Sequence, residues 1–354
     1  MNWIAFSIIL FLTCYTSVFL YEKIRQNNYK SIEKETELFG FYHTNALKAV
    51  SILLIIFAHM GNKFGVRYLN PLGGIGVAIF LILSGYGLNE SYQKNGMKNF
   101  WFKRVTGAYI PYLLIEIIGY LFVYKNITLK SVTEDLLLIH SMHPFGWYMS
   151  FIFLWYFIYF IINRIVNETS YKYGLYIIIS IFLFFVLNML PAQQAFSFIL
   201  GVMLSIYKED VSRRLVHLAA TRLVWNIPLV LAVGILALKQ TYIIRGLPVK
   251  AATLYELCMY LMFALYIIIL SSKIIWNGKA VIFYPIRAIG TIAFQIYLLH
   301  AFTFPMLNHI SYQAIICFLV STAILSLIFF VLCKYINRQL KHYHVILEKK
   351  NNPG

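Results

Sequence analysis

The sequence predicts an all-α protein, a polytopic bundle of about 10–11 transmembrane helices. Of its 354 residues, 60% are apolar and only 12% are charged, whereas about 25% are charged in an ordinary soluble protein. The mean hydropathy is +0.72. The apolar residues gather in runs of about 20, which is the length that a helix needs to cross a bilayer. Helices are required because lipid offers no partner to an unpaired backbone group.

Eleven segments are candidates for these spans, and the second and the seventh of them are short. The first has no cationic n-region and no small-residue cleavage site before Glu22, so we expect a retained helix rather than a signal peptide. The approximate spans are Trp3–Leu20, Ala46–His59, Gly73–Asn89, Ala108–Tyr124, Gly146–Asn163, Leu175–Leu190, Ala195–Tyr207, Leu223–Leu238, Leu254–Leu270, Ile289–Met306 and Ala314–Ile336.

The basic residues alternate between the connections. The chain has 30 Lys and Arg against 13 Asp and Glu. Of these basic residues, 22 lie at the ends of odd-numbered spans or in the connections after them, 7 follow even-numbered spans, and Lys48 lies inside the second span. Cytoplasmic loops retain Lys and Arg. We therefore expect a multi-pass protein of the cell membrane with its N-terminus outside and its C-terminus in the cytoplasm. The positive charge then needs no nucleic-acid partner, and membrane lipids are the expected surroundings.

The connections are short, so any chemistry is expected inside the bundle or at its mouths. We expect an extra transmembrane helix at 1–21, a cytoplasmic linker at 22–44, a membrane domain at 45–336 and a basic cytoplasmic tail at 337–354. The four cysteines lie in apolar runs without CxxC spacing, which indicates neither a disulfide framework nor a metal site. No internal repeat is evident, and this weakly disfavours a secondary transporter.

Ionisable residues inside apolar spans are candidate functional residues, because each costs a few kcal/mol to insert. Lys48 and His59 are eleven residues apart, so one helical stripe carries both, about 16 Å apart. Alternatively, Lys48 snorkels to the cytoplasmic interface and His59 lies at the outer one. His300 can exchange a proton with a substrate hydroxyl, or it is satisfied by a neighbouring hydroxyl or amide. Glu116 either pairs with a cation or lines a polar seam.

Two further segments have unusual compositions. Five glycines lie between Gly73 and Gly87, and they allow close approach of another helix or of a ligand; helix packing is the simpler interpretation. The connection Lys98–Arg104 is basic and aromatic. Such a segment attracts either anionic lipid or an anionic cofactor.

Taken in order, these segments resemble the membrane-bound acyltransferase 3 family, whose members move acyl groups, commonly acetyl, onto sugars of cell-surface polysaccharides and related glycans. The resemblance covers roughly 45–300. Its motifs are Lys48 with ten positions before His59, Gly74–Gly76 with Phe80 and Ser84-Gly85-Tyr86, Lys103 and Arg104 before Pro111, Gly146-Trp147-Tyr148-Met149, and Ile296-Tyr297-Leu298-Leu299-His300.

The resemblance implies an O-acyltransferase, with acetyl as the expected group, that takes acyl groups from cytoplasmic acyl-coenzyme A. The implied acceptor is a carbohydrate hydroxyl of a cell-surface polysaccharide or a lipid-linked glycan. It further implies catalytic roles for Lys48, His59 and His300, and contacts of Lys103 and Arg104 with the cofactor phosphates. Substrate binding or structural support is implied for Ser84, Gly85, Tyr86, Glu116, Trp147 and Tyr297.

This sequence departs from the family pattern in its basic segment, where the family usually has two arginines three positions apart. Gly107 stands three positions after Arg104, so the second cation is missing or is supplied by Lys103. No esterase-like domain follows the helices, so we expect the acceptor to meet the membrane part directly.

Several alternatives stay open at this point. A histidine either acts as the general base on the acceptor hydroxyl or carries the acyl group covalently. The rival functions are a transporter or exporter of a glycan or lipid-linked sugar, and a non-catalytic subunit of a polysaccharide synthesis complex.

Overall fold

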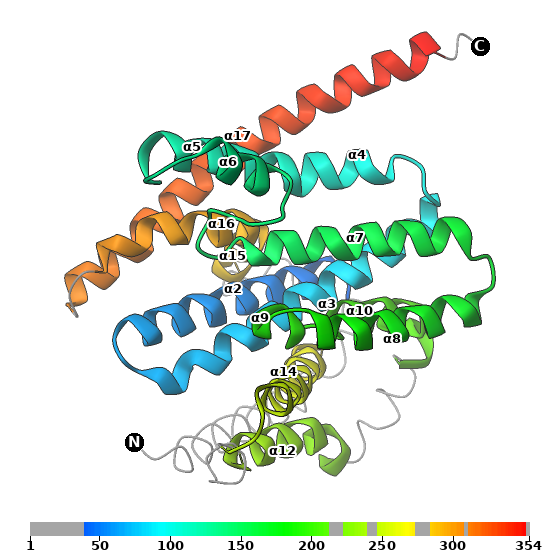
Figure 1. The fold of residues 1–354 in the computed structure, drawn as a ribbon, viewed down its shortest axis with the longest axis vertical. Coiled ribbons are helices and arrows are strands. Elements are labelled where there is room, and N and C mark those ends of the chain that lie inside the picture. The colour runs from blue at the N-terminus through cyan, green and yellow to red at the C-terminus, as the bar shows by residue number, and fades with distance from the viewer. Residues whose placement is uncertain (1–38, 212–221, 239–245, 273–283, 308–310, 352–354) are drawn as a thin grey trace, which may run out of the picture. The chain divides into compact units, whose positions relative to one another are not determined.

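The computed structural model of the protein describes residues 39–211, 222–238, 246–272, 284–307 and 311–351 (Figure 1). Every secondary-structure element in these ranges is a helix, which confirms the all-α prediction. The chain divides into two compact units. The first unit contains the described residues of 39–94 and 162–291, and the second contains those of 95–161 and 292–351.

Eight helices of the described residues are long and apolar enough to cross a membrane, or nine if one interrupted pair is a single span. The prediction of a polytopic membrane protein is therefore confirmed. The expected first span, 3–20, lies outside the described residues, as does most of the expected linker. The observed helices are generally longer than the apolar runs; the second expected span, for example, is a helix from Phe41 to Lys63.

The first unit is built around three long helices, α2, α3 and α14. Its core contains buried side chains from these helices and from α12, among them Leu47, Ile79, Leu236 and Met259. The elements of the unit are α2 (Phe41–Lys63), η1 (Arg67–Leu69), α3 (Asn70–Asn95), α8 (Thr169–Val186), α9 (Met189–Ala192), α10 (Ser197–Ile206), α12 (Arg222–Leu238), α14 (Val249–Ser272) and α15 (Tyr284–Thr291).

The glycines of α3 allow other helices of the first unit to approach its backbone. A Cβ atom on Gly85 would meet the carbonyl oxygen of Phe198 on α10, and a Cβ atom on Gly74 would meet the ring of Tyr260 on α14. Both positions therefore require glycine for packing. This agrees with the simpler of the two interpretations of the glycine-rich segment.

Replacing Gly85 with alanine is expected to lower the free energy of unfolding by about 1–3 kcal/mol, because the added methyl group forces α3 and α10 apart. Thermal unfolding in detergent measures the effect. Gly87→Ala on the same helix is the matched control, since nothing lies within 4 Å of a Cβ atom there and alanine favours a helix more than glycine does. Equal stability of the two variants would contradict the packing role of Gly85.

The second unit contains a long helix with a π-helical turn, a connection with one short helix, and three further helices. The expected basic tail is helical as far as Asn351. The elements are α4 (Phe100–Arg104), the π-helical turn η2 (Val105–Tyr109), α5 (Ile110–Phe122), α6 (Leu129–Leu136), α7 (Trp147–Ile165, whose last turn belongs to the first unit), α16 (Ala293–Thr303), η4 (Phe304–Met306) and α17 (Tyr312–Asn351).

The structure corrects the interpretation of the segment Lys98–Arg104 as a connection. One continuous span runs from Phe100 to Phe122, so most of this segment is the beginning of a helix. The aromatic residues between its cations give the segment an apolar side, and Phe100 is buried. Pro111 has no N–H group for the regular helical ladder. The preceding turn is π-helical, and the N–H of Ile110 donates to the carbonyl of Val105.

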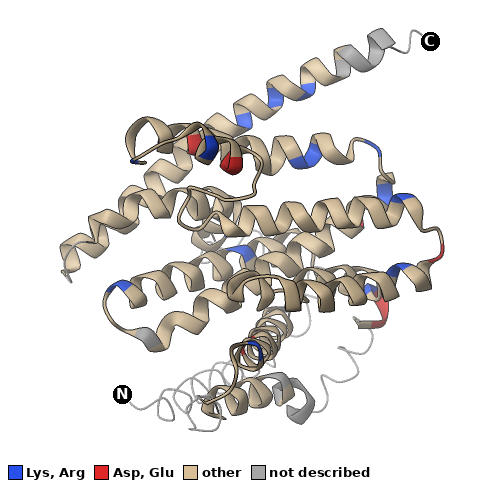
Figure 2. Cartoon of the chain, viewed as in Figure 1, with Lys and Arg blue, Asp and Glu red and all other residues tan. Residues whose placement is uncertain are grey.

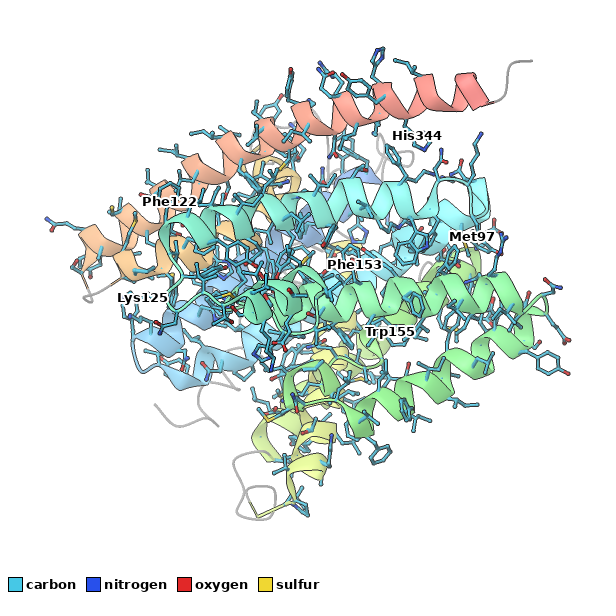
Figure 3. All side chains as sticks on the ribbon, turned by 45° about the horizontal axis from the view of Figure 1, so that its top comes forward. Met97, Phe122, Lys125, Phe153, Trp155 and His344 are labelled. Atoms are coloured by element: carbon cyan, nitrogen blue, oxygen red, sulfur yellow. The ribbon has the colours of Figure 1, made fainter. Side chains whose placement is uncertain are left out.

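The basic residues of the second unit gather toward one end (Figure 2). Lys98 precedes α4, Lys103 and Arg104 end it, and further Lys and Arg lie on the C-terminal half of α17. The rings of Phe102 and His344 join these segments at a centroid distance of 4.1 Å. Figure 3 shows Met97 and His344 at this end and Lys125 at the far end of α5. The two segments that the charge count assigns to the same side therefore lie at the same end of this unit.

Candidate functional site

Lys48 and His59 lie on α2 of the first unit. Both side chains are half-buried in a helix that is otherwise largely apolar. Within the described part of the chain, Lys48 forms no hydrogen bond or ion pair. Its ammonium group therefore has hydrogen-bonding capacity for an anionic ligand or for an anionic lipid headgroup.

The Ser84-Gly85-Tyr86 motif belongs to the packed part of the first unit. The ring of Tyr86 is buried and stacks on Phe39 at a centroid distance of 4.2 Å. The N–H of Phe39 in turn donates to Nδ1 of His43 over 2.9 Å. The geometry of Gly85 and Tyr86 accordingly fits structural support, whereas Ser84 is half-buried.

Arg104 lies near the start of the span of the second unit that contains Glu116. Its guanidinium carbon lies 4.9 Å from the ring centroid of Phe100 and 5.9 Å from that of Tyr156. Cation–π contacts of this kind contribute about 0.5–2 kcal/mol each, so the two rings hold the guanidinium in place. The neighbouring Lys103 is exposed. A half-buried Arg104 and an exposed Lys103 thus present two cations at the basic end of the unit.

Glu116 lies in a polar seam rather than in an ion pair. Its side chain is completely buried, and Oε2 accepts a hydrogen bond of 2.8 Å from the hydroxyl of Tyr124. No Lys or Arg of the described residues lies within ion-pair distance of it. The observed partner therefore matches the second of the two alternatives for this residue.

His300 lies on α16 of the second unit and is completely buried. Its Nδ1 is 2.7 Å from the carbonyl oxygen of Tyr297, which can only accept, so Nδ1 carries the proton. In the neutral ring, Nε2 is then the atom with the lone pair, which is the form of a general base. The ring of Phe145 stacks on the imidazole with the centroids 4.8 Å apart and the planes 3° apart.

Two motifs that are distant in the sequence meet around His300. The hydroxyl of Tyr297 donates to the carbonyl oxygen of Phe145 over 2.5 Å. The ring centroids of Tyr148 and Tyr297 lie 5.2 Å apart, and those of Trp147 and Tyr148 lie 6.5 Å apart. The structure therefore brings Trp147, Tyr297 and His300 into one aromatic cluster.

Three residues of this region have no role in the sequence analysis, namely Asp135, His143 and Phe145. Asp135 and His143 are buried although both lie in the connection between two spans. An Asp in a connection between spans is expected to face solvent, so the sequence does not predict that Asp135 is buried. His143 and Phe145 directly precede the Gly146-Trp147 motif, and this adjacency is the one available clue.

Comparison with known proteins gives a family match but no individual relative. The model of a family described as an acyltransferase domain, acyltransferase 3, matches residues 42–335. No curated protein and no solved structure matches the chain significantly. The matched range includes every candidate residue named above. The chain therefore belongs to the acyltransferase 3 family and is a membrane acyltransferase.

Proposed function

We propose that the protein is an O-acyltransferase, with acetyl as the expected group, that takes the acyl group from cytoplasmic acyl-coenzyme A. The acceptor is a hydroxyl of a cell-surface polysaccharide or of a lipid-linked glycan. The proposal rests on the 2.7 Å contact between Nδ1 of the buried His300 and the carbonyl oxygen of Tyr297, because it assigns the proton to Nδ1. Nε2 of the neutral ring then suits proton abstraction from a hydroxyl. Family membership supplies the reaction class.

In the proposed reaction, the hydroxyl proton of the acceptor moves to Nε2 of His300 while the acceptor oxygen forms a bond to the acyl carbon. The carbon–sulfur bond breaks, and the coenzyme A thiolate takes the proton from the imidazolium. His59 is the second proposed catalytic histidine, as a base or as a covalent carrier of the acyl group. Lys48 supplies a positive charge on the helix that bears His59.

Arg104 and Lys103 are the proposed contacts for the phosphates of coenzyme A. A guanidinium group binds phosphate oxygens through paired N–H donors, and Phe100 and Tyr156 hold that of Arg104 in place. The exposed Lys103 is the proposed second cation.

Arg104→Ala is expected to raise the apparent KM for acyl-coenzyme A about tenfold or more and to leave that for the sugar nearly unchanged. The reason is that a charge-assisted hydrogen bond contributes about 1.5–3 kcal/mol. Saturation curves for both substrates at equal protein amount measure the effect. Arg164→Ala, which removes an exposed arginine, is the control. If Arg104 instead anchors the protein to lipid, the variant has a lower protein level and unchanged kinetics.

Acyl transfer and transport are separated by one assay. The purified protein in liposomes is incubated with acetyl-coenzyme A, radiolabelled in the acetyl group, and a mixture of sugars as acceptor. The proposal expects an alkali-labile sugar ester and release of the coenzyme A thiol. Uptake of sugar into the liposomes without ester formation would favour the transporter. The absence of both ester formation and uptake would favour the non-catalytic subunit.

The proposed orientation is testable without activity. The charge count places Arg213 and Arg214, after the seventh expected span, in the cytoplasm and Arg245, after the eighth, outside, but all three lie outside the described residues. Lys130 and Lys341 are described and exposed. In a variant without the four native cysteines, an impermeant maleimide is expected to label Lys130→Cys in intact cells and Lys341→Cys only after permeabilisation. The reverse order would place Arg104 away from cytoplasmic coenzyme A and would contradict the proposed mechanism.

A further inference from the structure

A chain of hydrogen bonds in the second unit begins at Asp135 on α6. This carboxylate is completely buried, yet three donors from two segments converge on it. Its Oδ1 accepts from the hydroxyl of Tyr112 over 2.5 Å and from the N–H of Met142 over 3.2 Å. Its Oδ2 accepts from the hydroxyl of Tyr120. Asp135 therefore joins α5 to the segment that leads into α7.

The hydrogen-bond chain continues along that segment through Ser141 and His143. Ser141 Oγ lies 2.6 Å from the hydroxyl of Tyr112 and accepts from the N–H of His143 over 3.1 Å. Nδ1 of His143 accepts from the N–H of Phe145 over 3.1 Å, and Nε2 donates to the carbonyl oxygen of Leu298 over 2.9 Å. Both contacts require a neutral ring, and burial lowers the pKa of His143, which favours the neutral form.

The hydrogen-bond chain ends at Phe145. Its carbonyl oxygen accepts from the hydroxyl of Tyr297, and its ring lies flat on the imidazole of His300. The imidazole is thus held on its edge by the carbonyl of Tyr297 and on its face by Phe145. Each hydrogen bond from Asp135 to Phe145 fixes the backbone that carries this ring.

We propose that Asp135 and His143 are positioning residues for His300, because they hold the segment 141–146 so that Phe145 fixes the direction of Nε2. This inference rests on the proposed function, in which Nε2 is the base. Small displacements of a reacting group slow catalysis, since a shift of about 1 Å can lower the rate about a hundredfold. Neither Asp135 nor His143 needs to touch a substrate for this role.

Asp135→Asn tests the proposal, because it keeps the size of the side chain and replaces an acceptor oxygen by an amide group. We expect kcat to fall about ten- to a hundredfold and the KM for acyl-coenzyme A to stay within about twofold. Tyr109→Phe is the matched control. It removes the 2.6 Å hydrogen bond from Tyr109 to the carbonyl of Leu136, which is next to Asp135 but does not belong to the hydrogen-bond chain. If Asp135→Asn does not fold, Tyr120→Phe removes one donor to the same carboxylate.

A double-variant cycle separates positioning from general loss of structure. Phe145→Leu keeps an apolar side chain but removes the flat ring. If Asp135 acts through Phe145, the double variant loses little more activity than Phe145→Leu alone, whereas independent effects multiply. Multiplied losses, or an unchanged kcat in both single variants, would overturn the proposal.

A second readout does not depend on activity. Diethylpyrocarbonate modifies accessible imidazoles, and mass spectrometry gives the rate at each histidine. We expect the rate at His300 to rise about tenfold in Asp135→Asn and to stay unchanged in Tyr109→Phe. The buried His43 of the first unit is the internal reference for general unfolding. If the wild type transfers no acyl group, the proposed function fails, but an unchanged rate at His300 still overturns the positioning role by itself.

Discussion

Replacing His59 with alanine is expected to abolish acyl transfer while the protein still inserts into the membrane. A positioned base contributes about 10²–10⁴ to a rate, and a covalent carrier cannot be bypassed, so we expect a loss of at least about a hundredfold. The side chain is half-buried on an apolar helix. Solvent is therefore a poor substitute for it. The labelled-ester assay at equal protein amount measures the loss.

The control for His59→Ala is a histidine outside the spans. His140 is exposed in the connection between α6 and α7, so His140→Ala is expected to keep full activity. The amount of each variant in the membrane fraction shows whether insertion is intact. Full activity of a correctly inserted His59→Ala variant would remove this residue from the mechanism.

The helical spans were predictable because insertion into lipid leaves a strong local signal. A run of about 20 apolar residues has few alternatives to a helix. Helix ends were less predictable, since Phe41–Thr44 and Phe100–Arg104 continue their helices although they contain polar or charged residues. There the aromatic side chains give an apolar face that a count of charges overlooks.

The expected tenth span shows a different limit of the sequence. It was one continuous segment, Ile289–Met306, but the structure ends α15 at Thr291 and begins α16 at Ala293. No proline marks this break. Just before it, α15 packs closely against α2, because a Cβ atom on Gly290 would meet the carbonyl oxygen of Asn45. Such a contact between distant residues leaves no pattern in the local sequence.

The candidate site was predictable where a residue conflicts with its surroundings. His300 and Glu116 stand out because they are ionisable residues in apolar segments, and both are completely buried. Asp135 could not be found in this way, because it lies in a short connection where acidic residues are common. Its importance comes from three donors that only the folded chain brings together.

His300→Gln is expected to lower kcat by about 10²–10⁴ and to leave the KM for acyl-coenzyme A within about threefold. The reason is that glutamine fills much of the same space and still donates a hydrogen bond, but it cannot accept a proton at neutral pH. A loss in kcat at constant KM is the pattern of an interaction made in the transition state. Steady-state kinetics of the purified variant measure both constants.

Thr303→Val is the matched control for His300→Gln, because it alters a buried residue one turn later on the same helix. Thr303 lies 2.6 Å from the hydroxyl of Thr322 on α17, so its loss is expected to lower stability by about 1–3 kcal/mol and to leave kcat unchanged. If both variants lose kcat equally, the effect of His300→Gln reflects the packing of α16. If His300→Gln keeps the wild-type kcat, proton abstraction does not depend on His300, and His59 becomes the base to test.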